Sequence, residues 1–492
     1  MADNVFGSEL FRDQLRTVQV PGGVETVMYG GERNPAPIVE AFGDVAQVAI
    51  IGYKSQGPAH AQNLRESLAA AGSDTRVVVG LREGSETRAI AESDGFTVEN
   101  GTLMTPEQAM KGAGVVTMLI EDSAMVQQGV RYMREMDRGT LLMLAHGIYQ
   151  GHVDTNPEAD FLDGLRVGMV APKGLGPSVR RLYQQGSGIN ASFAVERGDD
   201  KTRDLVLAYS QGIGSPYTFQ TTLGSEWRSD IFGERAILLG GVHGIVEALY
   251  SWKREHGRGS EEAYMEVVES LVGPISEAIS HRGLEGLFES IEGDEDRQKF
   301  IEAYNAAYPT MKDLTLKVYE DVSSGREIAE VVNDNISGRP FTTVDGSSMW
   351  RAGERVRESM DEDTRSERVA IDPTVAGVYA AGMMAQVDVL RLKGHHWSEI
   401  VNESIIEAVD SLNPYMRKRG VAFMVDNCSI TARRGGRKWA PQFQAVISQG
   451  ALPVIDGQRA QGDDYFTAFL NHDVHQAFRV FAQMRPNVDI SL

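Results

Sequence analysis

The chain has 492 residues, of which 42% are hydrophobic and 24% charged, and its formal net charge is −21. This length suffices for roughly two to four domains, and the acidic balance argues against nonspecific binding to nucleic acid or an anionic membrane. The single cysteine, Cys428, excludes an intrachain disulfide and is typical of a reducing compartment. No signal peptide and no apolar run long enough to span a membrane are recognisable. We expect a cytoplasmic protein; a plastid protein that has lost a transit peptide is the alternative.

The first half of the chain has the pattern of an α/β domain. Residues 1–44 show no regular pattern and are expected to form an arm, whereas residues 45–51 (VAQVAII) are typical of a buried strand. A helix is expected from 59 to about 71. Further strands are predicted at 76–80, 115–120, 139–144 and 167–170. Because these strands alternate with helices, they predict a parallel, doubly wound sheet.

From about Thr222 onward, long amphipathic segments predict a mostly helical region. The segments are 236–255, 260–280, 294–308, 314–323, 374–392, 398–412 and 464–484. Residues 337–373 are rich in Gly, Arg, Asp and Ser and are expected to form a loop or partly ordered linker. Residues 241–271 and 377–409 resemble each other weakly, which leaves both a duplication and a chance similarity open.

The turn after the first buried strand resembles a dinucleotide-binding fingerprint. Its sequence, GYKSQG, keeps the first and third glycines of that motif, Gly52 and Gly57. Lys54 replaces the second glycine, which normally lets the backbone approach the pyrophosphate. The Lys54 side chain must therefore point away or offer its ammonium to the phosphates. A purely structural turn is the alternative.

The loop after the second strand favours NADP over NAD. An acidic residue there would bind the ribose hydroxyls of NAD, but this loop carries Arg82, Ser85 and Thr87. A guanidinium beside hydroxyl groups suits a 2′-phosphate. This interpretation requires that Glu83 and Glu86 point away from the cofactor.

Two pairs of carboxylates, each spaced by four residues, predict a site for a hard cation. Asp230 and Glu234 form one pair, and Glu403 and Glu407 form the other. On a helix this spacing places both carboxylates on one face, where they repel each other unless a cation such as Mg²⁺ lies between them. A solvated acidic helix face is the alternative.

Two further polar residues follow predicted strands. His146 comes after LLMLA and Lys173 after VGMVAP. Open α/β sheets bind ligands at the carboxyl ends of their strands, so both are candidates for the site. Structural roles are equally open for each of them.

These motifs together resemble the ketol-acid reductoisomerase (acetohydroxy-acid isomeroreductase) family in its long, plant-like class II form. The stretches that carry the resemblance span nearly the whole chain. They are GYKSQGPAHAQNLRESL, the Arg82 loop, AHG, APKGLGPSVRRLY, SDIFGERAILLG, NESIIEAVDSLNP and VDNCSITA. Lys54 is a departure, since the family usually has glycine there.

The resemblance implies a fold and an assembly. It implies an N-terminal Rossmann NADP-binding domain over residues 1–212 and an all-α C-terminal domain made of a duplicated, knotted helical unit. The first helical repeat would cover 213–355 and the second 356–492. The duplication would supply the whole site within one chain, and a homodimer is expected by analogy.

The resemblance also implies roles for individual residues. Asp230 would bridge two Mg²⁺ ions, Glu234 would bind one, and Glu403 and Glu407 would complete the site, with Glu407 also moving a proton. Ser429 would contact the substrate, and His146 and Lys173 would act as catalytic residues. NADPH would lie against a larger set: Tyr53, Lys54, Ser55, Gln56, Arg82, Ser85, Thr87, Asp122, Ser123, Ala124 and Gly176.

The activity implied by the resemblance is that of an oxidoreductase of valine and isoleucine biosynthesis. It comprises Mg²⁺-dependent alkyl migration in 2-acetolactate or 2-aceto-2-hydroxybutyrate and reduction by NADPH to a 2,3-dihydroxy-3-methyl acid. An NADP-dependent 2-hydroxyacid or phosphogluconate-type dehydrogenase is the enzymatic alternative. A redox sensor that binds nucleotide without turnover is the non-enzymatic one.

Overall fold

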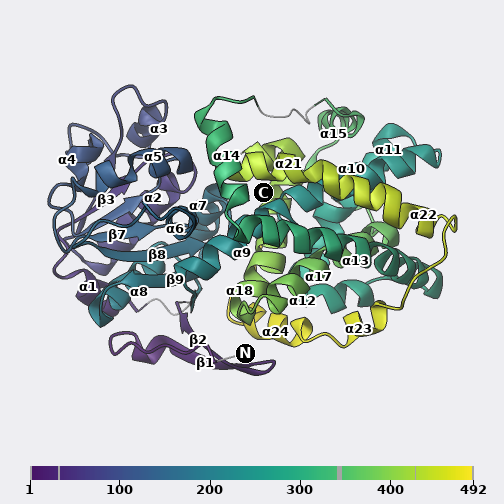
Figure 1. Cartoon of the computed structure of the whole chain (residues 1–492), viewed down its shortest axis with the longest axis horizontal. Helices are drawn as coiled ribbons and strands as arrows, with labels where there is room; N and C mark the ends of the chain where they lie inside the picture. The colour runs from purple at the N-terminus through teal and green to yellow at the C-terminus, as the bar shows by residue number, and fades with distance from the viewer. Residues whose placement is uncertain (1–2, 31–33, 341–345, 427, 490–492) are drawn as a thin grey trace. The chain divides into compact units, whose positions relative to one another are not determined.

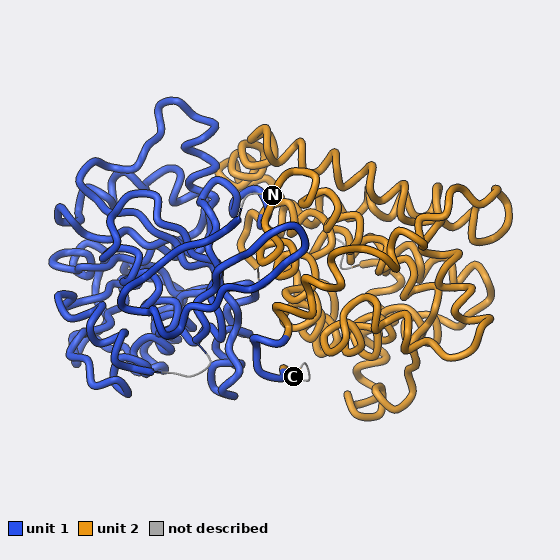
Figure 2. Tube along the Cα trace, turned by 90° about the horizontal axis from the view of Figure 1, so that it is seen from below, with its two compact units in different colours: residues 1–230, 483–487 blue, residues 231–482, 488–492 orange. Residues whose placement is uncertain are grey.

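The computed structural model describes residues 3–30, 34–340, 346–426 and 428–489 (Figure 1). The chain divides into two compact units (Figure 2). The first, here called the sheet unit, comprises residues 1–230 and 483–487, and the second, the helical unit, comprises 231–482 and 488–492. This division lies beyond the predicted domain boundary at 212/213, because a strand at Tyr217–Gln220 still belongs to the sheet.

One ten-stranded sheet organises the sheet unit, in the order β1-β2-β10-β9-β8-β7-β6-β3-β4-β5. The strands from β8 to β5 in that order are parallel, whereas β9 is antiparallel to β8. The strand bounds are β1 Leu15–Val20, β2 Gly23–Tyr29, β3 Gln47–Ile51, β4 Arg76–Gly80, β5 Leu103–Met104, β6 Val115–Met118, β7 Leu141–Leu144, β8 Arg166–Pro172, β9 Ala191–Arg197 and β10 Tyr217–Gln220.

Helices cover both faces of this sheet, which confirms the doubly wound α/β prediction. In β3, Val48 and Ile50 belong to one hydrophobic core and Ala49 and Ile51 to another, because successive strand side chains point to opposite faces. The first core contains side chains of α1 Ala36–Phe42, α2 Gly57–Ala71, α3 Arg88–Ser93 and α8 Asp200–Gly212. The second contains side chains of α4 Pro106–Met110, α5 Asp122–Met133 and α6 Ile148–Thr155.

The prediction of an irregular N-terminal arm is wrong for most of residues 15–42. β1 and β2 form a hairpin around Gly22, whose φ is +80°, and β2 continues the sheet by pairing with β10. Two alternating segments separated by Pro-Gly-Gly, TVQV and VETV, are a hairpin signal. The sheet is therefore mixed rather than wholly parallel, with an antiparallel addition at one edge.

The helical unit contains no strand within its described residues, which confirms the prediction of an all-α second part. Its helices are α10 Gly240–Glu255, α11 Ser260–Tyr264, α12 Ser276–Glu289, α13 Asp294–Ser323, α14 Arg326–Ile336, α15 Ser348–Ser359, α16 Glu362–Arg368, α17 Pro373–Leu392, α18 Trp397–Val401, α19 Asn413–Arg419, α20 Val421–Asp426, α21 Ile430–Val446, α22 Leu452–Ile455, α23 Phe466–Leu470 and α24 Val474–Ala482. Helix α9 Leu223–Arg235 crosses the division between the units.

Two local predictions for this region need correction. The expected linker at 337–373 contains α15 and α16, and only its residues 341–345 lie outside the described part. The expected long helix at 464–484 is two short helices, α23 and α24. Among the described residues, α17 is the one helix long and apolar enough to cross a membrane, but it is mostly buried inside the protein and packs along α13.

π-Helical segments recur at a fixed interval and support the predicted duplication. Met265–Glu269 (η2) and Leu271–Ile275 (η3) form one pair, and Asn402–Ile406 (η4) and Ala408–Leu412 (η5) form the other. Each segment of the second pair begins 137 residues after its counterpart, at 402 against 265 and at 408 against 271. The two copies differ in chemistry. At this interval the counterparts of Glu403 and Glu407 are Glu266, which pairs with Lys253 at 2.9 Å, and Ser270.

Candidate functional site

The glycine turn follows β3, the strand at which the strand order of the sheet reverses. β3 pairs with β4 on one side and β6 on the other, and its connection leads into α2. Gly52 has φ +101°, and a Cβ there would lie 2.4 Å from the Leu119 carbonyl oxygen that follows β6. A Cβ on Gly57 would lie 2.4 Å from the Gly52 oxygen. Both glycines are therefore required by the close packing of strand, turn and helix, as a dinucleotide fingerprint demands.

A second segment packs tightly on this turn. A Cβ on Gly176, at the start of α7 Gly176–Gln184, would lie only 2.0 Å from the Ser55 oxygen, and Gln56 Nε2 donates to the Gly174 oxygen at 2.9 Å. The structure thus brings Ser55, Gln56 and Gly176 together, three of the predicted cofactor positions. Lys54 is exposed, as a contact with phosphate would require.

The Tyr53 side chain points into the protein rather than toward a ligand. It is 2% exposed, and its hydroxyl donates to Asp94 Oδ2 at 2.8 Å. Burial, together with the hydrogen bond to the Asp94 carboxylate, raises the pKa of this phenol. Any contribution of Tyr53 to cofactor binding must therefore come from its backbone.

The loop after β4 exposes Arg82, whereas Ser85 and Thr87 are half-buried. Arg82 is exposed and forms no ion pair with the described residues, and Ser85 Oγ lies 3.1 Å from Thr87 Oγ1. The Ser85 N–H donates to the Arg82 carbonyl at 3.1 Å, which holds the loop as a compact turn. Such a turn keeps the guanidinium and the two hydroxyls on a short stretch of backbone.

His146 pairs with Asp122, another of the predicted cofactor positions. His146 Nε2 lies 3.0 Å from Asp122 Oδ1, whose side chain is 3% exposed. Burial lowers the pKa of His146, but the charge and hydrogen bond of Asp122 and the charges of Asp230 and Glu226 raise it to about 10. The Asp122 carboxylate therefore favours the protonated form of the imidazole.

The backbone N–H groups at the start of α5, beside Asp122, donate to a carboxylate of the chain itself. The N–H groups of Ser123 and Ala124 each donate to the Glu121 carboxylate at 3.1 Å. Glu121 therefore caps the helix N-terminus at which the sequence predicts a cofactor contact.

Lys173 is paired with a residue that the sequence-based interpretation missed. Lys173 Nζ lies 3.3 Å from Glu226 Oε1, both side chains are buried, and the Gly147 N–H donates to the other Glu226 oxygen at 2.5 Å. Burial raises the pKa of the Glu226 carboxyl, and Asp230 raises it further, whereas Lys173 and His146 lower it. Glu226 thus joins Lys173 to the loop that carries His146.

Glu226 extends the first carboxylate pair into a row of three. Residues 226, 230 and 234 follow one another at four-residue steps along α9, so their side chains share one face of the helix. Asp230 and Glu234 are half-buried, and Glu226 is fully buried. The four-residue repeat was the signal that could have identified Glu226.

The second pair lies on the π-helical part of the helical unit. Glu403 is fully buried in η4, and Glu407 follows η4 and is half-buried. Gln386 of α17 donates to the Glu403 carbonyl at 3.0 Å and accepts from the Ile237 N–H at 3.0 Å. It thereby ties the Glu403 segment to the residues that directly follow α9. π-Helical turns are frequent at functional sites.

Ser429 begins α21, where its Oγ accepts from the Ala432 N–H at 3.0 Å and lies 2.9 Å from Thr431 Oγ1. The hydroxyl therefore caps the helix, and no catalytic triad involving Ser429 is seen among the described residues.

No metal centre is assembled within the described part of the chain: no group of three or more His, Cys, Asp or Glu side chains there is arranged to hold an ion. Of the four predicted ligands, Asp230 belongs to the sheet unit and the other three to the helical unit. The donor set itself, carboxylate oxygens only, fits a hard cation such as Mg²⁺.

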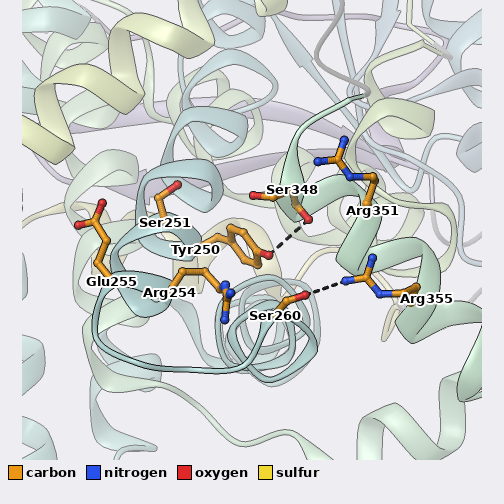
Figure 3. A pocket seen from close by; sticks show the side chains of 8 residues that line it. All are labelled: Tyr250, Ser251, Arg254, Glu255, Ser260, Ser348, Arg351 and Arg355. Atoms are coloured by element: carbon orange, nitrogen blue, oxygen red, sulfur yellow. Dashed lines mark hydrogen bonds between the residues drawn. The ribbon is translucent and has the colours of Figure 1, made fainter.

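A cavity of about 380 Å³ lies elsewhere in the helical unit (Figure 3). It is lined by residues of α10, α11 and α15, including Arg254, Arg351 and Arg355. Arg355 is neutralised by Glu261 at 2.5 Å and also donates to Ser260 Oγ at 2.7 Å. None of the predicted site residues lines this cavity, so it is not the candidate active site.

The fold and the polar residues define a class of protein. A doubly wound sheet with a glycine turn at its switch point, followed by an all-α unit, is the architecture of a Rossmann-type, nicotinamide-dependent oxidoreductase. Two family models match: "Acetohydroxy acid isomeroreductase, NADPH-binding domain" over residues 44–218 and "Ketol-acid reductoisomerase, C-terminal domain" over 223–362.

Similar proteins narrow the class to one family. The chain is 45% identical to "Ketol-acid reductoisomerase, chloroplastic" of Spinacia oleracea over 99% of this chain and 83% of that protein. It is 30% identical to "Ketol-acid reductoisomerase (NAD(+))" of Desulfosudis oleivorans over 65% of this chain and 91% of that protein. A solved NADH-preferring ketol-acid reductoisomerase from an uncultured archaeon shares the fold, with TM-score 0.60 and 21% identity over 68% of this chain and 99% of that one. The chain belongs to the ketol-acid reductoisomerase family.

Proposed function

We propose that the chain catalyses the two-step reaction of its family with NADPH and Mg²⁺. An alkyl group migrates within 2-acetolactate or 2-aceto-2-hydroxybutyrate, and the resulting 2-keto group is reduced. The observation that carries the proposal is the row of charged groups formed by Asp122, His146, Glu226 and Lys173, since it places two cationic side chains beside the start of the carboxylate row on α9.

Asp230, Glu234, Glu403 and Glu407 are the residues that would hold Mg²⁺. Their oxygen donors suit the ion, and Glu403 is buried in the π-helical part of the helical unit. When bound, Mg²⁺ supplies Lewis acidity and neutralises charge at two adjacent substrate oxygens. Glu407, half-buried beside η4, would accept the proton that leaves the substrate hydroxyl.

The remaining groups act through position and charge. The Lys173 ammonium, fixed by Glu226, would stabilise the negative charge that develops on a substrate oxygen. His146, held by Asp122, would orient the same part of the substrate by hydrogen bonding. Ser429, at the start of α21, would bind a polar substrate group from the helical unit.

NADPH is proposed over NADH because of the loop after β4. Arg82, Ser85 and Thr87 together suit a 2′-phosphate. Among the described residues, no carboxylate forms an ion pair with the Arg82 guanidinium. Relatives with different nicotinamide preferences exist, since one is named for NAD(+) and one solved structure is described as NADH-preferring. When bound, NADPH supplies hydride to the 2-keto carbon.

The relatives also bear on location and assembly. The spinach and pea relatives are both named chloroplastic, which favours the plastid alternative over a cytoplasmic location. A homodimer follows from family analogy alone and is tested by light scattering of the purified chain.

The proposed activity is tested by following NADPH oxidation with 2-acetolactate, with and without Mg²⁺ and after EDTA treatment. We expect turnover that requires Mg²⁺ and stops with EDTA. Oxidation that EDTA leaves unchanged would favour the hydroxyacid dehydrogenase alternative. NADPH binding without any turnover, measured by nucleotide fluorescence, would favour the redox sensor.

A further inference from the structure

Arg235 lies at the centre of a buried network in the helical unit. Its side chain is 0% exposed, and Nη1 donates to Glu234 Oε2 at 2.6 Å, Nε donates to Glu327 Oε1 at 3.1 Å, and Nη2 donates to the Thr431 carbonyl at 3.0 Å. Each nitrogen of the guanidinium therefore binds a different element, namely α9, α14 and the start of α21.

The backbone of α21 is shaped around this guanidinium. A Cβ on Gly435 would lie 2.2 Å from Arg235 Nε and 2.3 Å from Cζ. Because any larger residue at 435 would displace the guanidinium, α21 and Arg235 fix each other in place. The planar fork of arginine directs its N–H groups at three separated acceptors, a spread that the compact ammonium of lysine cannot reproduce.

Glu327 is the second carboxylate that balances the charge of Arg235. Glu327 is 0% exposed, and Lys438 Nζ binds its second oxygen at 2.7 Å while also binding Glu330 at 2.5 Å. Burial raises the pKa of the Glu327 carboxyl, but Arg235 and Lys438 lower it, with a net lowering. Arg235 thus shares its charge between two carboxylates, only one of which is a predicted metal ligand.

We propose that Arg235 and Glu327 are positioning residues that prepare the Glu234 carboxylate to bind a divalent cation. Arg235 fixes the direction of the Glu234 carboxylate by holding Oε2. Glu327 neutralises part of the positive charge of the guanidinium. The negative charge of Glu234 is therefore less completely balanced by Arg235 and can attract the cation. Through Thr431 the same arginine fixes the start of α21, where Ser429 lies. The inference rests on the proposed function, because it requires the metal site.

Glu330 supplies a matched control for Glu327. Both carboxylates lie on α14 and bind Lys438, but within the described residues only Glu327 reaches Arg235. Glu327→Gln keeps the size of the side chain and removes its charge, and Glu330→Gln makes the same chemical change one turn away. With a neutral Gln at 327, Glu234 is the one carboxylate of the pair that still neutralises the Arg235 guanidinium. The Glu234 carboxylate should then attract a cation less strongly.

The test measures binding of Mn²⁺ alone to the full chain by electron paramagnetic resonance, without substrate or turnover. We expect Glu327→Gln to raise the dissociation constant of Mn²⁺ by about 10-fold, within the range for changes around metal ligands, and Glu330→Gln to leave it unchanged within about 2-fold. NADPH affinity should be unchanged in both variants. Equal Mn²⁺ affinity of the two variants would overturn the positioning role.

A second variant keeps the inference testable if Glu327→Gln is poorly folded, which circular dichroism would reveal. Arg235→Lys keeps the positive charge but lacks the planar fork that reaches three separated acceptors, and it should raise the dissociation constant of Mn²⁺ by a similar factor. Unchanged Mn²⁺ binding in folded Arg235→Lys would also overturn the inference. Absence of Mn²⁺ binding in the unsubstituted chain would overturn the metal site itself, and the inference with it. If the unsubstituted chain binds Mn²⁺ but the variants bind it equally well, the inference fails and the proposed function stands.

Discussion

Lys173 Nζ lies 3.3 Å from Glu226 Oε1, and both side chains are buried within the sheet unit. Removing one partner of such a pair leaves an uncompensated buried charge, which typically costs about 3–5 kcal/mol of stability. We therefore expect Lys173→Met to lower the free energy of unfolding by about that amount in urea titrations.

The double variant Lys173→Met/Glu226→Gln should be more stable than Lys173→Met alone, because it removes the stranded carboxylate. Losses that simply add in the double variant would show that the two side chains do not interact energetically. Activity should be lost in all of these variants.

Arg82→Ala should weaken NADPH far more than NADH. Loss of a charge-assisted contact with the 2′-phosphate costs about 2 kcal/mol, or about 30-fold in the NADPH dissociation constant. Arg88→Ala is the control, because Arg88 lies on the same segment but pairs with Glu92 at 3.2 Å. Fluorescence titration with both nucleotides provides the measurement, and equal losses for NADPH and NADH in Arg82→Ala would contradict the role.

Gly176→Ala should damage cofactor binding without unfolding the chain. The new methyl group would lie 2.0 Å from the Ser55 oxygen, so the glycine turn must shift. We expect NADPH affinity to fall at least about 10-fold. In Gly7→Ala the methyl group meets open space, and binding should not change. Unaltered binding in Gly176→Ala would mean that the turn tolerates the displacement.

His60 should make the sheet unit sensitive to acid. It is fully buried, its Nδ1 lies 2.9 Å from the Tyr209 hydroxyl, and burial lowers its pKa from 6.5 to about 3. Below pH 6.5 the unfolded chain binds a proton at this histidine that the folded chain does not bind. Stability should therefore fall as the pH drops from about 6.5 to 3, by up to about 5 kcal/mol.

Comparison with His60→Gln isolates this contribution, since glutamine does not titrate. The difference in unfolding free energy between the two proteins should change steadily across that pH range and stay constant above pH 7. A difference that is flat between pH 4 and 7 would show that His60 takes up its proton over the same pH range in the folded and unfolded chains.

The sequence predicted the parts of the fold that are governed by local patterns. Buried apolar runs identified the parallel strands, and the glycine turn was correctly expected because Gly52 and Gly57 have a local steric role. The N-terminal hairpin carried a local signal as well, but its alternation was overlooked. Glu226 has the same four-residue spacing as Asp230 and Glu234 on α9. Its pairing with Lys173, which marks it as part of the site, is a contact between distant residues that the local sequence does not indicate.

Other features depend on contacts between distant residues. Arg235 meets Glu327 from 92 positions away, and no spacing or composition in either segment indicates that pairing. The π-helical turns of η4 and η5 likewise require one extra residue per hydrogen-bonded ring, which apolar periodicity does not distinguish from an ordinary helix. Such features follow from packing in the helical unit rather than from local propensity.

The 137-residue recurrence of π-helical pairs places both copies of the pattern in a single polypeptide. When identical chains form the two halves of a symmetric assembly, every substitution occurs in both halves. In a tandem chain each copy changes by itself. At the positions that Glu403 and Glu407 occupy in the second copy, the first copy has Glu266, which pairs with Lys253, and Ser270. If Glu403 and Glu407 bind the metal as proposed, the first copy is free to evolve as a scaffold while selection for metal binding acts on the second.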